Sequence, residues 1–215
     1  MFRVALTFDA EHPDRPAAPG NAERLLDVLD AEAIRATIFV QGRWAEAFPA
    51  TARRIAAAGH LVGSHSHYHA RLPLLSDDGI AKDLRDAEAA ILEHAGVDPK
   101  PWFRCPFGVG AEDPRVIAVV ERLGYRDVHW NVTSQDWEPH LDAADVARIV
   151  VDVATMRGDG AVVLQHTWPD QTLDATPEIA ARLRDLGATF VTVDELPRLP
   201  PPPSHKPAGD AAQSP

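Results

Sequence analysis

The chain has 215 residues, a length that suits one domain or a small two-domain protein with a sizeable core. Its formal net charge of −11 argues against a nucleic acid or an anionic membrane surface as the main partner. No stretch reaches the ~18 consecutive apolar residues of a membrane-spanning helix, and the single cysteine, Cys105, excludes an internal disulfide framework. Charged residues interrupt the apolar run at the N-terminus, so we find no secretion signal and expect a cytoplasmic protein.

Short apolar runs of the β type alternate with helix-like stretches along most of the chain. This alternation favours an α/β fold with a parallel sheet, and the number of strands suits a (β/α) barrel smaller than a complete eightfold barrel of ~250 residues. A doubly wound open sheet is the competing architecture. The expected strands are 2–8, 36–40, 60–64, 101–103, 127–130, 161–165 and 188–193, and the expected helices lie near 21–33, 44–58, 77–95, 113–123, 142–156 and 176–186.

The boundaries of these helices carry recognisable signals. Asn21, Asp113 and Thr176 are of the residue types that cap helix N-termini, and proline follows the last two. Several helices end at glycines that can adopt a positive φ, namely Gly59, Gly96, Gly124 and Gly187. No glycine-rich phosphate-binding motif follows the first strand, which disfavours nucleotide binding.

The C-terminal segment 197–215 differs in composition from the rest of the chain. It is rich in proline and small polar residues, which is typical of a disordered or polyproline appendage. We therefore predict one globular domain over residues 1–196, followed by a tail outside the core.

Polar residues that could take part in catalysis or metal binding follow five of the expected strands. In parallel α/β folds, functional groups gather at the carboxyl ends of the strands. We therefore expect these side chains to converge in space. They are Asp9, Glu11 and His12 after the first strand, His65, His67 and His69 after the third, Arg104 after the fourth, Asp136 and Trp137 after the fifth, and His166 after the sixth.

The histidines after the third strand suggest a metal site. His65 and His69 are four residues apart, so a helical turn would place both imidazoles on one face at a spacing that suits a divalent ion. His67 is two residues from each, and an extended chain would place all three on one face. Spacing alone does not choose between these pairs, and a histidine-rich surface loop is the alternative interpretation. Imidazole favours zinc, cobalt, nickel or iron, with a carboxylate to complete the set.

The segments TFD, HSHYH, FRCPFG, QDW and LQH, in this order, resemble the five motifs of the polysaccharide deacetylase family, carbohydrate esterase family 4. The resemblance covers nearly the whole globular part of the chain. It implies a distorted seven-stranded (β/α) barrel and a hydrolase that removes acyl groups, mostly N-acetyl groups of amino sugars, by means of a metal-activated water. The implied partner is a carbohydrate or another acylated small molecule.

The resemblance also implies roles for single residues. Asp9 resembles the catalytic base of the family, and Arg104 resembles the arginine that pairs with this base. His65 and His69 resemble the two histidines that bind the metal, with Ser66 between them. The cofactor implied is a divalent ion, zinc before cobalt or nickel.

Four further positions correspond to the acid side of the reaction and to the substrate groove. His166 resembles the general acid, and Asp136 resembles the carboxylate that tunes it. The backbone N–H of Phe107 corresponds to the oxyanion donor, and Trp137 corresponds to a wall of the groove. Trp168, two residues after His166, is a candidate to stack on a sugar face, whereas Trp44, Trp102 and Trp130 are expected to pack in the core.

The first motif departs from the usual pattern of the family. The second aspartate of T-F-D-D, which binds the metal in most members, is Ala10 here. Some branches use D-x-D or D-x-E, and Glu11 would then replace the missing ligand, because residues two apart on a strand share a face. His12 and Asp14 are less favoured substitutes. Alternatively, Ala10 marks a lost metal site in a relative without catalytic activity.

These observations predict a metal-dependent N-deacetylase of an amino-sugar-containing substrate. Deformylases, cyclic amidases and acetyl esterases of the same superfamily share the metal and the water, so the motifs do not separate them. Two alternatives come from other classes: a catalytically silent carbohydrate-binding barrel, and a protein whose histidines hold a structural metal. The sequence makes no prediction of the oligomeric state.

Overall fold

The computed structural model describes residues 1–14 and 20–202. Its strands are β1 Phe2–Ala10, β2 Thr37–Val40, β3 Leu61–Ser64, β4 Trp102–Phe103, β5 Arg126–Asp127, β6 Val132–Thr133, β7 Ala161–His166 and β8 Ala188–Phe190. Its α-helices are α1 Asn21–Ala31, α2 Gly42–Ala47, α3 Pro49–Ala57, α4 Asp77–Ala95, α5 Pro114–Arg122, α6 Ala143–Arg157 and α7 Asp170–Asp185. Short 3₁₀ turns occur at Leu72–Leu74, Pro106–Gly108 and Val193–Glu195.

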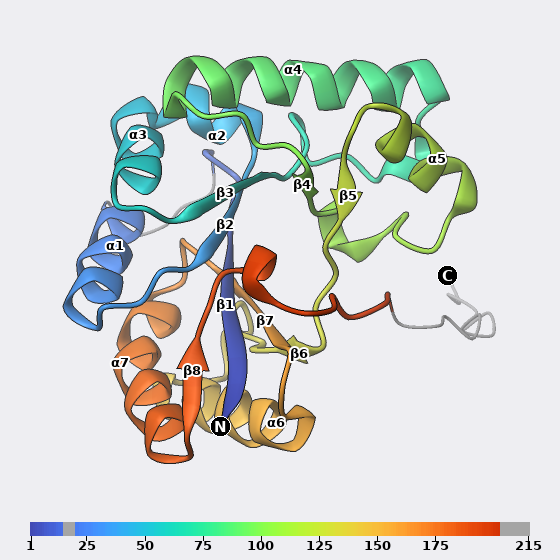
Figure 1. Cartoon of the computed structure of the whole chain (residues 1–215). Coiled ribbons are helices and arrows are strands. Elements are labelled where there is room, and N and C mark those ends of the chain that lie inside the picture. The colour runs from blue at the N-terminus through green and yellow to red at the C-terminus, as the bar shows by residue number, and fades with distance from the viewer. Residues whose placement is uncertain (15–19, 203–215) are drawn as a thin grey trace, which may run out of the picture.

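The strands form one parallel sheet that curls into an open barrel. Seven strands follow the order β5-β4-β3-β2-β1-β7-β6, and β8 pairs with the first residues of β1. The edge strands β5 and β6 are neighbours in sequence, and helices surround the curled sheet (Figure 1). The predicted α/β fold, a distorted seven-stranded barrel, is confirmed.

The region between β5 and β6 differs from the expected strand 127–130. Val128 donates its N–H to Phe103 on β4, whereas Asn131 donates its N–H to Val162 on β7. The chain therefore crosses from one edge of the sheet to the other within a few residues. Because its hydrogen bonds go to two different strands, it forms two short strands instead of one continuous strand.

The side chains of β1 alternate between the inside and the outside of the barrel. Val4, Leu6 and Phe8 belong to the large apolar cluster between the sheet and the helices, whereas Ala5 packs inside the barrel. Asp9 continues the inward series at the carboxyl end of the strand, as side chains two residues apart share a face. The inside of the barrel is thus apolar around Ala5 and carries an ionisable group, Asp9, at the carboxyl end of β1.

Two predicted helix boundaries are wrong and one is confirmed. Helix α7 begins at Asp170, so Thr176 is not its N-cap and Pro177 lies inside the helix. Gly20, not Asn21, caps α1. The side chain of Asn21 donates instead to the carbonyl of Trp168 and to Asp170 Oδ1, a contact with the start of α7 that local sequence does not reveal. Asp113 caps α5 as predicted, through the N–H groups of Arg115 and Val116.

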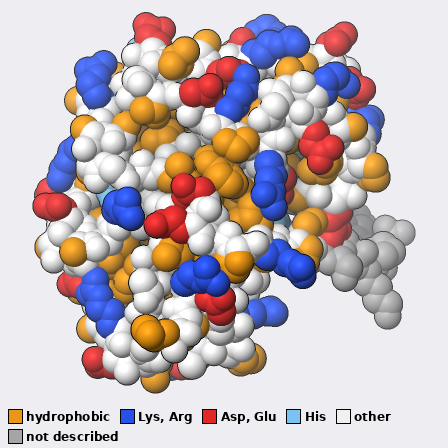
Figure 2. Space-filling view, in the orientation of Figure 1, with side chains coloured by type: hydrophobic (Ala, Val, Ile, Leu, Met, Phe, Trp, Pro, Cys, Tyr) orange, Lys and Arg blue, Asp and Glu red, His pale blue; other side chains and the backbone are white. Residues whose placement is uncertain are grey.

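The glycines predicted at helix ends have positive φ: Gly59, Gly96, Gly124 and Gly187. The expected helix 44–58 is divided into α2 and α3 at Phe48, because Pro49 fixes its own φ and has no N–H to continue the ladder. None of the described helices is long and apolar enough to cross a bilayer. On the face seen in Figure 2, acidic and basic side chains lie interspersed among apolar groups.

The start of the predicted tail lies against the barrel. Leu199 is half-buried and packs on the cluster that contains Ala5, Phe39 and Leu196. The rest of the tail, residues 203–215, lies outside the described residues. Its disorder and the domain boundary at residue 196 therefore stay predictions.

Candidate functional site

A cavity of about 410 Å³ lies at the carboxyl ends of the strands. It gathers side chains from β1 and β7 and from the segments that follow β1, β3, β4, β5, β6 and β7. The residues that line it are Asp9, Glu11, His12, His65, His69, Phe107, Trp130, Trp137, Leu164, His166 and Trp168.

Arg104 occupies the inside of the barrel beneath this cavity, where it is 1% exposed. Its Nη1 donates to Asp9 Oδ1 at 2.8 Å, its Nη2 to Thr7 Oγ1 at 2.8 Å, and its Nε to the carbonyl of Val128 at 3.0 Å. The guanidinium also lies 4.1 Å from the centre of the Phe39 ring. These contacts fix the Asp9 carboxylate beside a buried cation.

Glu11, His65 and His69 form a compact donor set. Glu11 Oε2 lies 2.6 Å from His69 Nε2 and 3.3 Å from His65 Nε2, and the two Nε2 atoms are 3.1 Å apart. Burial opposes ionisation of Glu11, but the hydrogen bonds from His65 and His69, together with the charges of His166 and His65, hold the pKa of this carboxyl well below its usual range. Glu11, which was predicted to replace the metal-binding aspartate of the family, therefore faces the predicted histidine pair.

The donor set fits a divalent metal ion. His65 Nδ1 lies 3.0 Å from the carbonyl oxygen of Arg104, which only accepts, so Nδ1 carries a proton. Nε2, which faces Glu11, is the nitrogen that would bind a metal once its own proton is released. One ligand atom from each of the three residues lies within 4.8 Å of the others. Two imidazole nitrogens and one carboxylate oxygen are a ligand set that zinc accepts, with a position left for water or substrate.

The loop geometry decides which histidines pair. Neither a helical turn nor an extended strand is present, because Ser66 and His69 adopt left-handed backbone conformations with φ of 61° and 57°. His67 turns away from the cavity and packs edge-on against Tyr68. The pair is therefore His65 and His69.

The two less favoured substitutes for the missing aspartate lie in different places. His12 Nε2 is 3.3 Å from Glu11 Oε1, and its ring packs edge-on against His69. Asp14 is bound to Arg43 at 3.0 Å, and its side chain is 79% exposed. His12 thus borders the donor set, whereas Asp14 faces solvent.

At the end of β7, next to Asp9 on β1, His166 is held by Asp136. Asp136 Oδ1 lies 2.8 Å from His166 Nδ1, and Asp136 Oδ2 accepts hydrogen bonds from the His166 N–H at 2.7 Å and from Thr172 Oγ1 at 2.6 Å. Burial alone would lower the pKa of His166, but the Asp136 charge and hydrogen bond raise it to about 9. His166 Nε2 lies 3.8 Å from Glu11 Oε1.

Aromatic rings surround these groups. Trp137 and Trp168 lie beside His166, with ring centres 5.3 and 5.7 Å from it. Phe107 is 51% exposed and packs edge-on against His69 with a centre distance of 4.3 Å. All three line the cavity.

Trp130, which was expected in the core, is half-buried and also lines the cavity. It lies in the segment that crosses between the sheet edges, stacks on His129 and donates its Nε1 to Thr133 Oγ1. The sequence could not reveal this crossing. Cys105, by contrast, is buried in an apolar cluster, where burial raises the pKa of its thiol, in agreement with a packing role.

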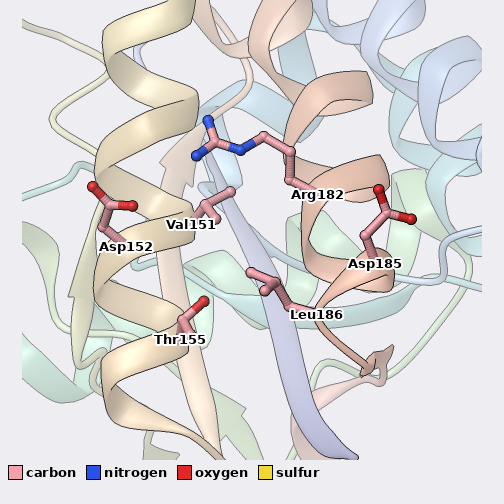
Figure 3. A pocket seen from close by; sticks show the side chains of 6 residues that line it. All are labelled: Val151, Asp152, Thr155, Arg182, Asp185 and Leu186. Carbon is pink, nitrogen blue, oxygen red and sulfur yellow. The ribbon is translucent and has the colours of Figure 1, made fainter.

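A second hollow, of about 470 Å³, lies between helices α6 and α7 (Figure 3). It contains none of the predicted site residues, and its open position outside the barrel separates it from the strand ends. The residues that line it are Val151, Asp152, Thr155, Arg182, Asp185 and Leu186. The candidate site is the cavity at the strand ends, because that cavity brings together Asp9, His65 and His166.

Comparison with known proteins agrees with this assignment. The family model described as "Polysaccharide deacetylase" matches residues 2–128, more than half of the chain. The chain belongs to the polysaccharide deacetylase family. Its membership confirms the predicted family and the predicted class of enzyme, the deacetylases; the metal and the substrate do not follow from the family alone.

Three similar proteins show the range of this family. The peptidoglycan-N-acetylglucosamine deacetylase of Bacillus cereus is 32% identical over 197 residues, which are 90% of this chain and 67% of the relative. A family 4 carbohydrate esterase from Streptomyces lividans, solved with acetate, has a TM-score of 0.76 at 31% identity, covering 88% of this chain and 91% of the other. A family 4 pseudoenzyme from Bacillus anthracis has a TM-score of 0.78 at 26% identity, covering 90% and 64%. The same fold thus occurs with and without activity, so catalysis depends on which side chains the fold carries.

Proposed function

We propose that this deacetylase removes N-acetyl groups from an amino sugar in a polysaccharide, an oligosaccharide or a small glycoside, and that it depends on a divalent metal ion. One observation carries the proposal. A single cavity combines a three-residue donor set with two ionisable groups, Asp9 and His166, each held by its own buried partner of opposite charge.

Glu11, His65 and His69 would hold the metal, for which zinc is favoured before cobalt or nickel. When bound there, the ion would lower the pKa of a water molecule and polarise the acyl oxygen. Proton transfer and stabilisation of the oxyanion would be carried out by groups of the protein.

Asp9 is proposed as the general base. Arg104 binds Oδ1, while Oδ2 lies 3.6 Å from His65 Nε2, on the side of the donor set. The guanidinium thus holds the Asp9 carboxylate beside the donor set, where Asp9 would accept the proton of the attacking water.

His166 is proposed as the general acid, with Asp136 as its positioning residue. Asp136 keeps Nδ1 protonated and stabilises the imidazolium, so that Nε2 can donate a proton to the leaving amine. The backbone N–H of Phe107 would stabilise the oxyanion of the tetrahedral intermediate. Trp137 and Trp168 would pack against the sugar, whose apolar faces suit aromatic rings.

The same groups would also serve deformylation, cyclic-amide hydrolysis or ester deacetylation. An N-acetylated amino sugar is favoured because the relative from Bacillus cereus is named for that substrate. A second candidate is a carbohydrate-binding protein without activity. Ala10 in place of a metal-binding aspartate, and the likeness to a pseudoenzyme, favour this alternative.

Acetate release from N-acetylglucosamine oligomers by the zinc-loaded protein tests the proposal. We expect Asp9→Asn to lower the rate by at least about 100-fold, the usual contribution of a general base, while zinc stays bound. Asp14→Asn, which removes a carboxylate on the solvent side, is the matched control and should keep the rate of the parent. Sugar binding without hydrolysis of acetyl amides, formyl amides or acetyl esters would favour the binding protein.

A further inference from the structure

The loop that carries His65 and His69 has an unusual backbone. Ser66 and His69 both have positive φ, a conformation that is unfavourable for residues with a Cβ and persists only where surrounding contacts enforce it. One such contact is internal, since Ser66 Oγ accepts the N–H of His69 at 2.9 Å. The others come from two helices on either side of the loop.

Helix α2 binds the carbonyl groups of the loop. The N–H of Gly42 donates to the carbonyl of Ser66 at 2.9 Å, and the N–H of Arg43 donates to that of His67 at 3.4 Å. A Cβ on residue 42 would overlap with His67 Nδ1 and lie 3.0 Å from the Cα of Ala87. Glycine at this position therefore permits the close approach of helix and loop.

Helix α4 binds the N–H groups of the loop through one side chain. Asp83 Oδ2 accepts the N–H of His67, and Asp83 Oδ1 accepts the N–H of Tyr68, both at 3.0 Å. Asp83 is 4% exposed, so these bonds form away from water. Bonds from N–H groups to an ionised carboxylate are stronger than bonds between neutral groups.

We propose that Asp83 is the positioning residue of the metal site. Its carboxylate fixes the backbone at residues 67 and 68, which lie between the two histidines, so that both Nε2 atoms face Glu11. This inference rests on the proposed function, because it takes Glu11, His65 and His69 as the ligands. Asp83 itself lines no part of the cavity and acts through the backbone.

Zinc affinity of the metal-free protein, measured by competition with a chelating dye, tests this role. Asp83→Asn keeps the volume but offers one acceptor where two are needed, and its amide group opposes the second N–H. We expect the affinity to fall about 10- to 100-fold, as for other groups that orient metal ligands indirectly. Asp86→Asn is the matched control on the same helix, because Asp86 pairs with Lys82 on the surface; its affinity should stay within about twofold of the parent.

The results distinguish failure of the proposed role of Asp83 from failure of the metal site. Equal zinc affinity of Asp83→Asn and the parent would overturn the role of Asp83 and leave the proposed function intact. Absence of zinc binding by the parent would overturn the metal site itself, and the role of Asp83 with it. Lower stability of metal-free Asp83→Asn in urea, with unchanged zinc affinity of the folded protein, would reduce Asp83 to a structural residue.

Amide hydrogen exchange of the unmodified protein keeps the proposal testable if Asp83→Asn does not fold. The N–H groups of His67 and Tyr68 should exchange slowly, because both are bound to a buried carboxylate. Exchange at the rate of an exposed peptide would contradict the inference.

Discussion

At the scale of single residues, the three acidic groups in and beside the cavity each have a different partner. Asp9 meets a buried guanidinium, Glu11 lies between two imidazoles, and Asp136 binds an imidazole from outside the cavity. These contacts fix the position of each carboxylate, and they lower the pKa of Glu11 and raise that of His166. From these contacts we propose Asp9 as the base, Glu11 as a metal ligand and Asp136 as the residue that positions the acid.

The Asp136 pairing can be tested by Asp136→Asn. The amide cannot stabilise the imidazolium, so we expect kcat to fall about 10²- to 10⁴-fold, the usual contribution of a general acid. The pKa of His166, raised to about 9 by Asp136 in the parent, should fall in the variant. Because the acid must be protonated to act, activity is lost as pH rises through this pKa, and the alkaline limb of kcat/KM should therefore move to lower pH. An unmoved limb would remove His166 as the acid.

The role of Glu11 can be tested by Glu11→Gln. The amide lacks the charge that the two histidines face, so zinc affinity should fall at least about tenfold in calorimetric titration. Asp14→Asn again serves as control, because that carboxylate binds Arg43 on the solvent side. Unchanged affinity of Glu11→Gln would instead point to His12, whose Nε2 borders Glu11 at 3.3 Å.

Residues at strand ends could be predicted from the sequence, and residues on helices could not. Asp9 and His166 follow apolar runs, and their convergence follows from the parallel sheet. Asp83 and Thr172 lie on helices, with no local motif, and meet the site only through tertiary packing. The left-handed turn at Ser66 was also hidden, because serine gives no signal for positive φ.

At the scale of elements, one buried side chain connects separate parts of the sheet across the inside of the barrel. Arg104, from the segment after β4, donates to Val128 in the crossing segment and to Thr7 and Asp9 on β1. One buried cation thus joins three parts of the barrel. The boundaries of the elements were harder to predict where such contacts decide them, as at the start of α7, where Asn21 binds Asp170.

Arg104→Met tests this bridging role. The change leaves the buried Asp9 carboxylate without its cation, so we expect the free energy of unfolding to fall by about 3–5 kcal/mol. Urea unfolding of the metal-free protein measures it. Arg182→Met is the control, because its pair with Glu178 is on the surface and should change stability by less than about 1 kcal/mol. Equal stabilities of the two variants would contradict the bridge.

At the scale of the whole molecule, the open barrel determines what the strand ends can build. All strand pairs are parallel, so the polar residues that follow the strands meet at one end of the barrel, while its interior holds Ala5, Phe39 and Val162. The architecture was predictable from the alternation of strands and helices together with the family motifs. The functional consequence of Ala10 was not, because it depends on whether Glu11 reaches the histidines.

The metal content of the purified, untagged protein, measured by elemental analysis beside the His65→Ala/His69→Ala double variant, tests the central claim most directly. Our account predicts about one equivalent of zinc, cobalt or nickel in the parent, and none in the variant, because two of three ligands are lost. A parent without metal, even after incubation with each ion, would contradict a metal-dependent deacetylase and leave the carbohydrate-binding protein as the better account.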